Sequence, residues 1–313
     1  DFENRQKLFP IDSRFKFCLL TVAGSEAGTG AFDLAFFLHR ITDLHDDDRH
    51  FTLTPEEILL INPNTKNCPI FRSKRDAEIT KAVYRRVPVL VNEGEDEAGN
   101  PWGVSFQRMF DMSNDSHLFR TREDMEAAGF VLGGNRFVKG EEVWLPLYEA
   151  KMFHQYDHRF GTYEGVESRS STSIPTPTVE ERADPEYLAM PWYWVNHSEV
   201  ERKLESWDKK WLFGWRDITN ATNSRTYICS FSSIGAAGDT FLLMFPQSDV
   251  VKIACLNPSL ASFAFDFATR QKVGGVHIKY NIMKQLPVLP PSTYTPTLTD
   301  FIAPRVIELT YTA

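Results

Sequence analysis

The chain has 313 residues, of which 42% are hydrophobic and 13% aromatic, a composition that can bury one large core or two ordinary ones and that excludes an intrinsically disordered chain. Its formal net charge of −8 means that any affinity for a polyanion must come from a local cationic surface. No apolar run approaches the roughly 20 residues that span a bilayer. The opening DFENRQKLFP also lacks the apolar centre of a secretory signal, so we expect no membrane contact and a cytoplasmic location. Four widely separated cysteines without a CxxC pair predict buried free thiols.

The first third of the chain is predicted to contain two strands followed by two short helices. Aromatic and β-branched residues are frequent in 14–23 and 31–41, as is typical of strands. Thr54 is expected to cap a helix over PEEILLI. Ser73 is expected to cap a second helix, which Pro88 would end.

The middle of the chain is predicted to alternate short strands and turns. GVSFQRMF predicts a strand, and Thr121 is expected to cap a helix that stops at Gly129. Two short apolar runs around Gly134 predict a hairpin. Residues 166–191 are rich in Ser, Thr, Pro and Glu, which predicts an exposed loop or linker.

A long helix is predicted near the end of the chain, from Asp249 to Gln271, broken or recapped at Asn257 and Pro258. Four of its side chains have the spacing of a buried face: Leu260, Phe263, Ala264 and Phe267. The predicted class is α+β, with short mixed sheets and helices. The expected parts are residues 1–45, residues 46–165, the loop at 166–191, and residues 192–313.

The segment from Asn62 to Leu90 has a strong local cationic charge. Seven cationic side chains face only Asp76 and Glu78, a formal charge of +5. The seven are Lys66, Arg72, Lys74, Arg75, Lys81, Arg85 and Arg86. A cationic surface on an acidic protein suits a phosphodiester backbone, because it releases condensed counterions. A solvated helix face is the alternative.

Two further segments could contact nucleic acid. The run from Arg270 to Lys284 contains four cations and no acid, with a glycine pair that lets a loop approach a partner closely. The segment RDITNATNSRT offers the forked donors and amides that contact base edges, with an ordinary polar turn as the alternative. The candidate phosphate contacts are Arg72, Lys74, Arg75, Lys151, Lys272 and Lys279. The candidate base contacts are Arg216, Asn223 and Arg225.

Catalytic motifs are weak by comparison. Asn62-Pro63 is followed by neither a second proline nor an aromatic residue, and no glycine-rich cofactor turn precedes it. Glu149 and Lys151 resemble half of a metal-dependent nuclease site, with Asp111 and Asp115 as conceivable partners.

A metal pair is a further alternative. His154 and His158 would share a face if they lay on a helix, with Asp157 between them, but no third ligand is evident. Hydrogen-bonded structural histidines, or histidines that contact phosphate, are the competing interpretation. We expect no metal site and no catalytic residue in this region.

Several blocks of the sequence resemble large adenine-N6 DNA methyltransferases of restriction-modification and phage-defence systems. FENRQKLFPIDSRFKFCLLTVAG resembles the last strands of their catalytic domain. CPIFRSKRDAEITKAVYRRVPVL and LPLYEAKMFHQYDHRFGTYEG resemble the region that follows it. RQKVGGVHIKYNIMKQLPVLPP is similar to the end of Taq-type specificity domains.

This resemblance implies a target-recognition region for double-stranded DNA, in a parent that uses S-adenosylmethionine. The catalytic motifs and the cofactor site would lie before Asp1, so no cofactor is expected in this region. The implied partners are an upstream methyltransferase domain of the same chain and, as a possibility, restriction or defence subunits. Two alternatives stay open: a metal-dependent nuclease built on Glu149 and Lys151, and a protein-interaction scaffold, suggested by the acidic balance of residues 164–208.

Overall fold

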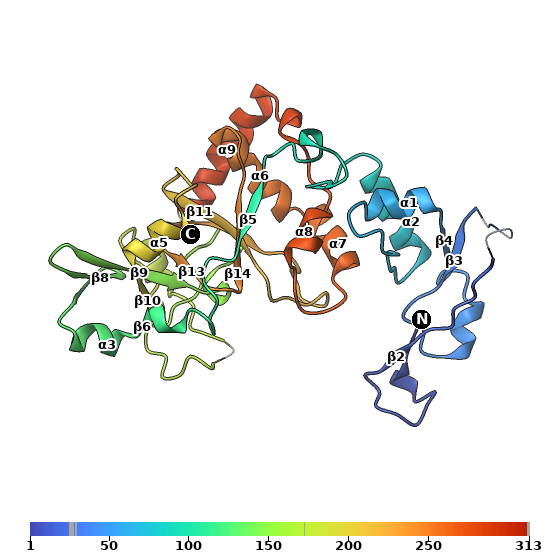
Figure 1. Cartoon of the computed structure of the whole chain (residues 1–313), viewed down its shortest axis with the longest axis horizontal. Coiled ribbons are helices and arrows are strands. Elements are labelled where there is room, and N and C mark those ends of the chain that lie inside the picture. Colours follow the sequence, from blue (N-terminus) through green and yellow to red (C-terminus); the bar gives the residue numbers. More distant parts are fainter. Residues whose placement is uncertain (25–27, 29, 172, 312–313) are drawn as a thin grey trace.

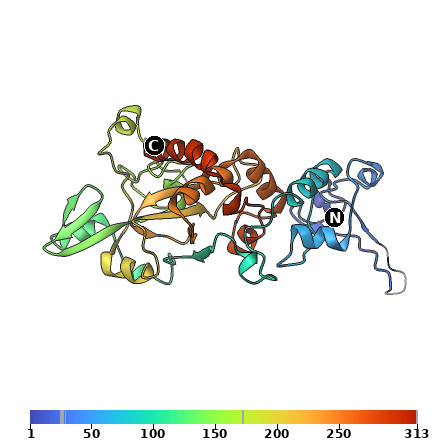
Figure 2. The same ribbon diagram turned by 90° about the horizontal axis from the view of Figure 1, so that it is seen from above.

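The computed structural model describes residues 1–24, 28, 30–171 and 173–311. The molecule is elongated, with the N-terminal segment at one end and the β7–β8 hairpin at the other (Figures 1 and 2). Short antiparallel sheets and short helices make up the described part, which confirms the α+β class. No single helix among the described residues is long and apolar enough to cross a membrane, although two consecutive helices meet the length and composition criteria as a pair bent by 62°.

The N-terminal part consists of two small two-stranded sheets and two α-helices, and one of the sheets packs with both helices around an apolar cluster. These elements are β1 (Phe2–Glu3), β2 (Lys16–Phe17), β3 (Phe32–Leu34), β4 (Phe51–Leu53), α1 (Pro55–Ile61) and α2 (Lys74–Tyr84). Phe51, Phe71 and Tyr84 lie in the cluster. Both predicted helix caps are confirmed, because the hydroxyls of Thr54 and Ser73 accept backbone N–H groups in the first turns of α1 and α2.

The predicted strand over 14–23 is only two residues long in the structure. After β2 the chain stays non-helical and unpaired through residue 24, and its side chains are exposed. Leu19, Leu20 and Val22 are each at least three-quarters exposed. These apolar side chains have no sheet to pack against within the described residues.

A four-stranded antiparallel sheet in the order β12-β11-β14-β5 forms the centre of the molecule. Its strands are β5 (Ser105–Gln107), β11 (Trp211–Arg216), β12 (Cys229–Ser233) and β14 (Phe241–Phe245). The helices beside it are α6 (Val250–Ala261), α7 (Phe263–Lys272), α8 (Tyr280–Lys284) and α9 (Pro296–Tyr311). Gly214 allows the close strand pairing, because an added Cβ would lie 2.5 Å from the Leu242 carbonyl oxygen of β14.

The second sheet has the order β6-β10-β9-β8-β7, with β13 parallel to β9. Its strands are β6 (Phe119–Arg120), β7 (Val131–Gly133), β8 (Arg136–Lys139), β9 (Glu142–Tyr148), β10 (Trp194–Asn196) and β13 (Ala236–Ala237). Three short helices accompany it: α3 (Arg122–Ala127), α4 (Val179–Ala183) and α5 (His197–Lys203). The predicted hairpin is confirmed, with Gly134 at a φ of 62° in its two-residue turn. Both sheets combine strands from 46–165 with strands from 192–313, so these two parts interleave in space.

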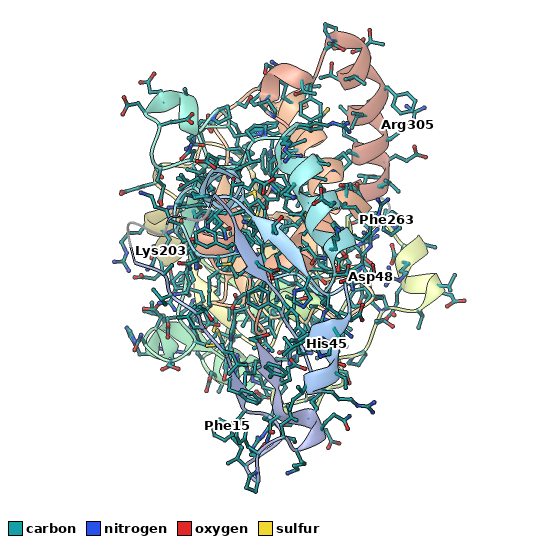
Figure 3. The ribbon with its side chains drawn as sticks, turned by 90° about the vertical axis from the view of Figure 1, so that its right-hand side faces the viewer. Phe15, His45, Asp48, Lys203, Phe263 and Arg305 are labelled. Atoms are coloured by element: carbon teal, nitrogen blue, oxygen red, sulfur yellow. The ribbon has the colours of Figure 1, made fainter. Side chains whose placement is uncertain are left out.

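The predicted long helix is broken at Ser262, five residues after the expected site at Asn257. Ser262 caps α7, which continues at 62° to α6. This break shifts the buried face to Phe265, so the expected burial of Phe263 and Ala264 is wrong. Phe263 is 80% exposed and points outward on the same side as Arg305 (Figure 3).

The N-terminal part joins the centre through buried polar contacts with α7 and α8, which lie between α2 and the central sheet (Figure 1). The Tyr84 hydroxyl donates to the Gln285 carbonyl oxygen at 2.8 Å, and the Leu90 N–H donates to the Leu286 carbonyl oxygen. All four cysteines are free, as predicted. Cys18 and Cys68 are exposed, however, so the predicted burial holds only for Cys229 and Cys255.

Candidate nucleic-acid interface

The N-terminal end of α2 and the residues just before it carry an exposed cationic patch formed by Arg72, Lys74 and Arg75. None of the three is in an ion pair with a described residue; Arg72 instead lies over the Phe37 ring at 4.2 Å. The patch is a single unneutralised surface that could contact phosphates.

The C-terminal half of α2 is less cationic than its sequence suggests. Lys81 is buried between Glu57 and Glu78, with ammonium to carboxylate distances of 3.4 and 2.7 Å. Arg85 also pairs with Glu57, at 2.8 Å. Glu78 was included in the charge count, but Glu57 belongs to α1 and lies outside the segment whose charge was counted.

Lys272 is not exposed, which corrects its expected role as a phosphate contact on the surface. Its ammonium is enclosed and donates to the Ile61 carbonyl oxygen at 2.6 Å and to Asn62 Oδ1. Burial lowers the pKa of Lys272 to about 7. The side chain therefore joins α7 to the end of α1 and does not reach toward solvent.

Lys279 is half-exposed but already has an acidic partner. Asp217, at the end of β11, accepts from the Lys279 ammonium at 2.7 Å and contacts His277 Nδ1 at the same distance. The segment from Arg270 to Lys284 contains no acid, but folding brings the buried Asp217 against it. A phosphate near Lys279 would have to share it with Asp217.

Lys151 is held by the loop at 166–191. Its ammonium donates to the Ser171 carbonyl oxygen at 2.8 Å and lies 4.8 Å from the centre of the Tyr163 ring. Burial and the nearby Arg169 charge lower the pKa of Lys151 against the opposing effect of Glu149. Lys151 thus anchors this loop, and its expected exposure to phosphate is wrong.

Arg216, the last residue of β11, and Arg225, on the segment that links β11 to β12, form a second cationic group. Arg216 donates to the Phe153 carbonyl oxygen, but its buried Nε has no hydrogen-bond partner. Arg225 lies 4.1 Å from the centre of the Phe263 ring, and its buried Nη1 likewise has no partner. Neither guanidinium is in an ion pair with a described residue.

Arg216 and Arg225 both lie close enough to His154 to act on its pKa. Burial lowers this pKa, and the charges of Arg216 and Arg225 lower it further against Asp157. Burial also lowers the pKa of Arg216, to about 10. Uncompensated cationic charge is therefore concentrated here, in a half-buried position.

Asn223, the third candidate for base contact, is exposed on the same segment. Its carbonyl oxygen accepts from Arg270 Nη2 at 2.7 Å, which fixes the backbone of the turn. Arg270 also pairs with Asp266 of α7, at 2.9 Å. The turn that carries Asn223 is thus braced against a core helix.

The described residues do not form the metal sites that were considered. Glu149 is buried, with its carboxylate bound by the Tyr163 hydroxyl at 2.8 Å and by Arg169 at 3.0 Å. His154 and His158 lie in consecutive turns and not on a helix, so the geometry assumed for the histidine pair is wrong. No group of three His, Cys, Asp or Glu side chains in the part of the chain that the structure describes could hold a metal ion.

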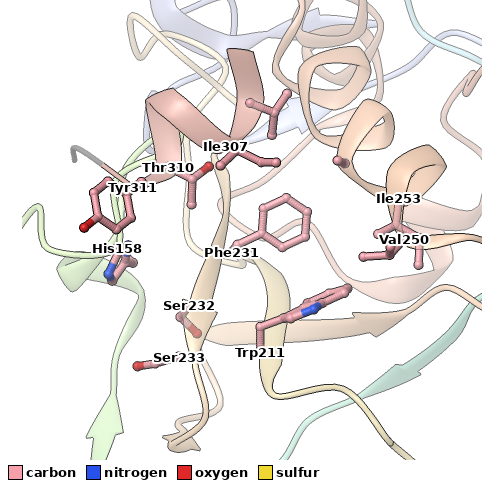
Figure 4. Close-up of a pocket in the computed structure, with 12 residues that line it drawn as sticks. His158, Trp211, Phe231, Ser232, Ser233, Val250, Ile253, Ile307, Thr310 and Tyr311 are labelled. Atoms are coloured by element: carbon pink, nitrogen blue, oxygen red, sulfur yellow. The ribbon is translucent and has the colours of Figure 1, made fainter. Parts of the chain in front are cut away.

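An apolar pocket of about 360 Å³ lies between β11, β12, α6 and α9 (Figure 4). Trp211, Phe231 and Ile253 form its walls, and His158 and Tyr311 lie at its edge. No acidic or strongly basic side chain lines it. The pocket therefore contributes nothing to a phosphate-binding surface.

The structure brings together some of the predicted cations and separates others. Arg216, Arg225 and Lys279 lie at or beyond one end of the central sheet, whereas α2 lies on the other side of α7 and α8 (Figure 1). Phe160 and Phe263, whose rings lie against these two arginines, were not predicted as site residues. The exposure of Phe263 depends on the break before α7, which the N-cap Ser262 could have indicated from the sequence. The position of Phe160 depends on the turns at 154–160.

Comparison with known proteins adds no assignment. No family model matches the sequence, and no curated protein matches it either.

Proposed function

We propose that this chain is the target-recognition region of a site-specific adenine-N6 DNA methyltransferase, with double-stranded DNA as its partner. The observation that carries the proposal is the pair Arg216 and Arg225. Both have a buried guanidinium N–H group without an acceptor, and neither has an acidic partner among the described residues.

A buried donor without an acceptor costs about 1–3 kcal/mol, so an acceptor from a ligand is strongly favoured there. Guanine O6 and N7, or a phosphate oxygen, are the acceptors on DNA that arginine binds in a forked geometry. Stacking of Arg225 on Phe263 restricts the guanidinium and lowers the entropy lost on binding. These properties support base contact by Arg216 and Arg225.

The α2 patch supplies the second part of the proposal. Arg72, Lys74 and Arg75 are exposed cations in a protein with a net charge of −8, and they suit phosphates because they fix the register of a duplex without testing its sequence. Among the other expected phosphate contacts, Lys279 is kept, and a DNA phosphate would share its ammonium with Asp217. Lys151 and Lys272 are no longer proposed as contacts to DNA phosphates.

Methyl transfer from S-adenosylmethionine to a flipped adenine would occur in a domain upstream of this region. The exposed apolar segment at 18–24 supports such a domain. Leu19, Leu20 and Val22 lack a packing partner among the described residues, and a β-prone segment of this kind gains stability by adding to the sheet of a neighbouring domain.

A protein-interaction scaffold is a second candidate, and the same segment at 18–24 favours it. The apolar surface would then bind a partner protein, for example a restriction or defence subunit, and DNA would play no part. Nuclease activity has less support, because the Glu149 carboxylate is already bound by Tyr163 and Arg169.

Fluorescence anisotropy with a set of random-sequence and defined duplexes tests the proposal. Wild type should bind duplex DNA with an affinity that falls steeply with salt, and each of Arg72→Ser and Arg75→Ser should reduce the salt slope by about one. Arg216→Met and Arg225→Met should each reduce sequence discrimination by about tenfold or more. Arg136→Ser, at an exposed position on β8 at the far end of the molecule, is the matched control and should change neither.

Two results would contradict the proposal. One is the absence of duplex binding at low salt by the folded protein. The other is an equal loss for Arg136→Ser and Arg75→Ser, which would show that only net charge matters. Salt-insensitive association with a protein, without retention on DNA, would favour the scaffold.

A further inference from the structure

A polar pocket of about 280 Å³ lies at the joint between the N-terminal part and the centre of the molecule. The segment at 61–71 forms one wall, and Thr80 of α2 contributes to it. Lys272 of α7 and Gln285, which follows α8, line the opposite side. This pocket is separate from both cationic groups described above.

The Lys272 ammonium is the charged group of this pocket. Two of its three hydrogens are directed to neutral oxygens, the Ile61 carbonyl and Asn62 Oδ1. The Tyr84 ring lies 5.0 Å from the nitrogen. One ammonium hydrogen therefore remains for a further acceptor, and no lining residue of the pocket is an aspartate or glutamate.

Thr80 supplies a second donor. Its side chain is only 2% exposed, lines the pocket, and has a hydroxyl oxygen without any hydrogen-bond partner. A buried hydroxyl normally finds a partner, because an unsatisfied one costs free energy. A buried charge is normally paired as well. Both groups thus have a hydrogen left to donate, and an anion with several oxygens could accept from each.

We propose that this pocket binds the phosphate or carboxylate group of a small free anion, with the Lys272 ammonium and the Thr80 hydroxyl as donors. Its volume suits a small molecule. The ammonium is enclosed between α7 and the end of α1, so the backbone of a duplex is not the intended ligand. The proposal does not depend on DNA recognition.

Binding at this pocket would act on the joint itself. Lys272 connects α7 to Asn62, and Gln285 contacts Thr65 on the facing segment at 3.2 Å. An anion held between Lys272 and Thr80 would add a further connection between the two parts. It would thereby stabilise their arrangement.

Isothermal titration calorimetry with sulfate and with acetate, at constant ionic strength and about pH 6.5, tests the proposal. Sulfate stands in for phosphate because its charge is constant over the pH range used. Lys272→Met and Thr80→Val should each weaken binding, by about tenfold or more and by about threefold or more respectively. Thr80→Val should fold normally, because its hydroxyl makes no hydrogen bond in the structure.

Lysine resonances provide a readout independent of folding. Sulfate should shift the ¹³Cε signal of Lys272 and raise the pH at which it titrates, because an anion stabilises the ammonium. Sulfate affinity should fall as pH rises above that point. Cys68 also lines the pocket and Tyr84 contacts the Lys272 ammonium, but burial raises the pKa of both groups, so neither ionises in this range.

Lys284→Met is the matched control, because Lys284 lies on α8 but pairs with Glu93 outside the pocket. It should leave sulfate binding unchanged. The proposal would be overturned if wild type, Lys272→Met and Thr80→Val all bound sulfate with the same affinity, and likewise acetate. So would a loss of binding in Arg75→Ser with an unmoved Lys272 signal, or a Lys272 signal that shifts with a short duplex but with neither free anion.

Discussion

Replacing Lys272 by methionine should change how the free energy of unfolding depends on pH. Burial lowers the pKa of Lys272 from 10.5 to about 7 in the folded protein. Between these values the unfolded chain binds more protons at this side chain than the folded chain does. The free energy of unfolding of wild type therefore rises with pH in this window, as the cost of a buried charge disappears.

The magnitude follows from the two pKa values. Between roughly pH 6 and pH 9, the lysine contributes a rise on the order of 2 to 3 kcal/mol, at 1.36 kcal/mol per pKa unit. Methionine keeps most of the side-chain volume but cannot titrate. It also leaves the Ile61 carbonyl and Asn62 Oδ1 without their donor, so the difference at any single pH combines several effects. The change in that difference with pH isolates the buried charge.

Urea unfolding of wild type and Lys272→Met at several pH values provides the measurement, with linear extrapolation to water. From the acidic to the basic end of the series, the free energy of unfolding of wild type should rise on the order of 2 to 3 kcal/mol more than that of the variant. Lys284→Met should show no such gain, because its exposed ion pair contributes little. Parallel curves for wild type and Lys272→Met would show that the ammonium is not buried in the folded protein.

Three further predictions test the packing around the candidate interface. Phe263→Ser should change the free energy of unfolding by less than about 0.5 kcal/mol, whereas Phe265→Ser, two residues further along α7, should lower it by more than about 3 kcal/mol. Chemical denaturation of the two variants provides the measurement, and similar free energies of unfolding would refute the break before α7. Gly214→Ala should destabilise by about 2 kcal/mol or more because its Cβ would meet the backbone of β14, while Gly133→Ala, with open space around it, should be nearly neutral. Thermal unfolding separates the two glycine variants, and equal midpoints would contradict this account of β11. Glu149→Ala should cost about 2 kcal/mol or more, because it removes the acceptor of the Tyr163 hydroxyl and of the partly exposed Arg169. A loss of magnesium-dependent DNA cleavage at unchanged stability would instead identify a nuclease.

Local signals determined several elements of this protein without help from the rest of the chain. Thr54, Ser73 and Thr121 each cap a helix as predicted, because a hydroxyl needs only the next three residues to accept an N–H. Gly134 forms its hairpin turn for a similar reason, since a positive φ is a property of one residue. The series of short predicted strands and helices was likewise sufficient for the α+β class.

The tertiary structure alone determined which cationic side chains have no acidic partner. Lys279 meets Asp217, which is 62 positions away, and Lys272 meets the end of α1, more than 200 positions away. A charge count along the sequence includes only neighbours in the chain, whereas an ion pair depends on which side chains come within about 4 Å after folding. For this reason the sequence located the basic segments, but only the fold showed that Arg216 and Arg225 remain unneutralised and that Lys272 is enclosed.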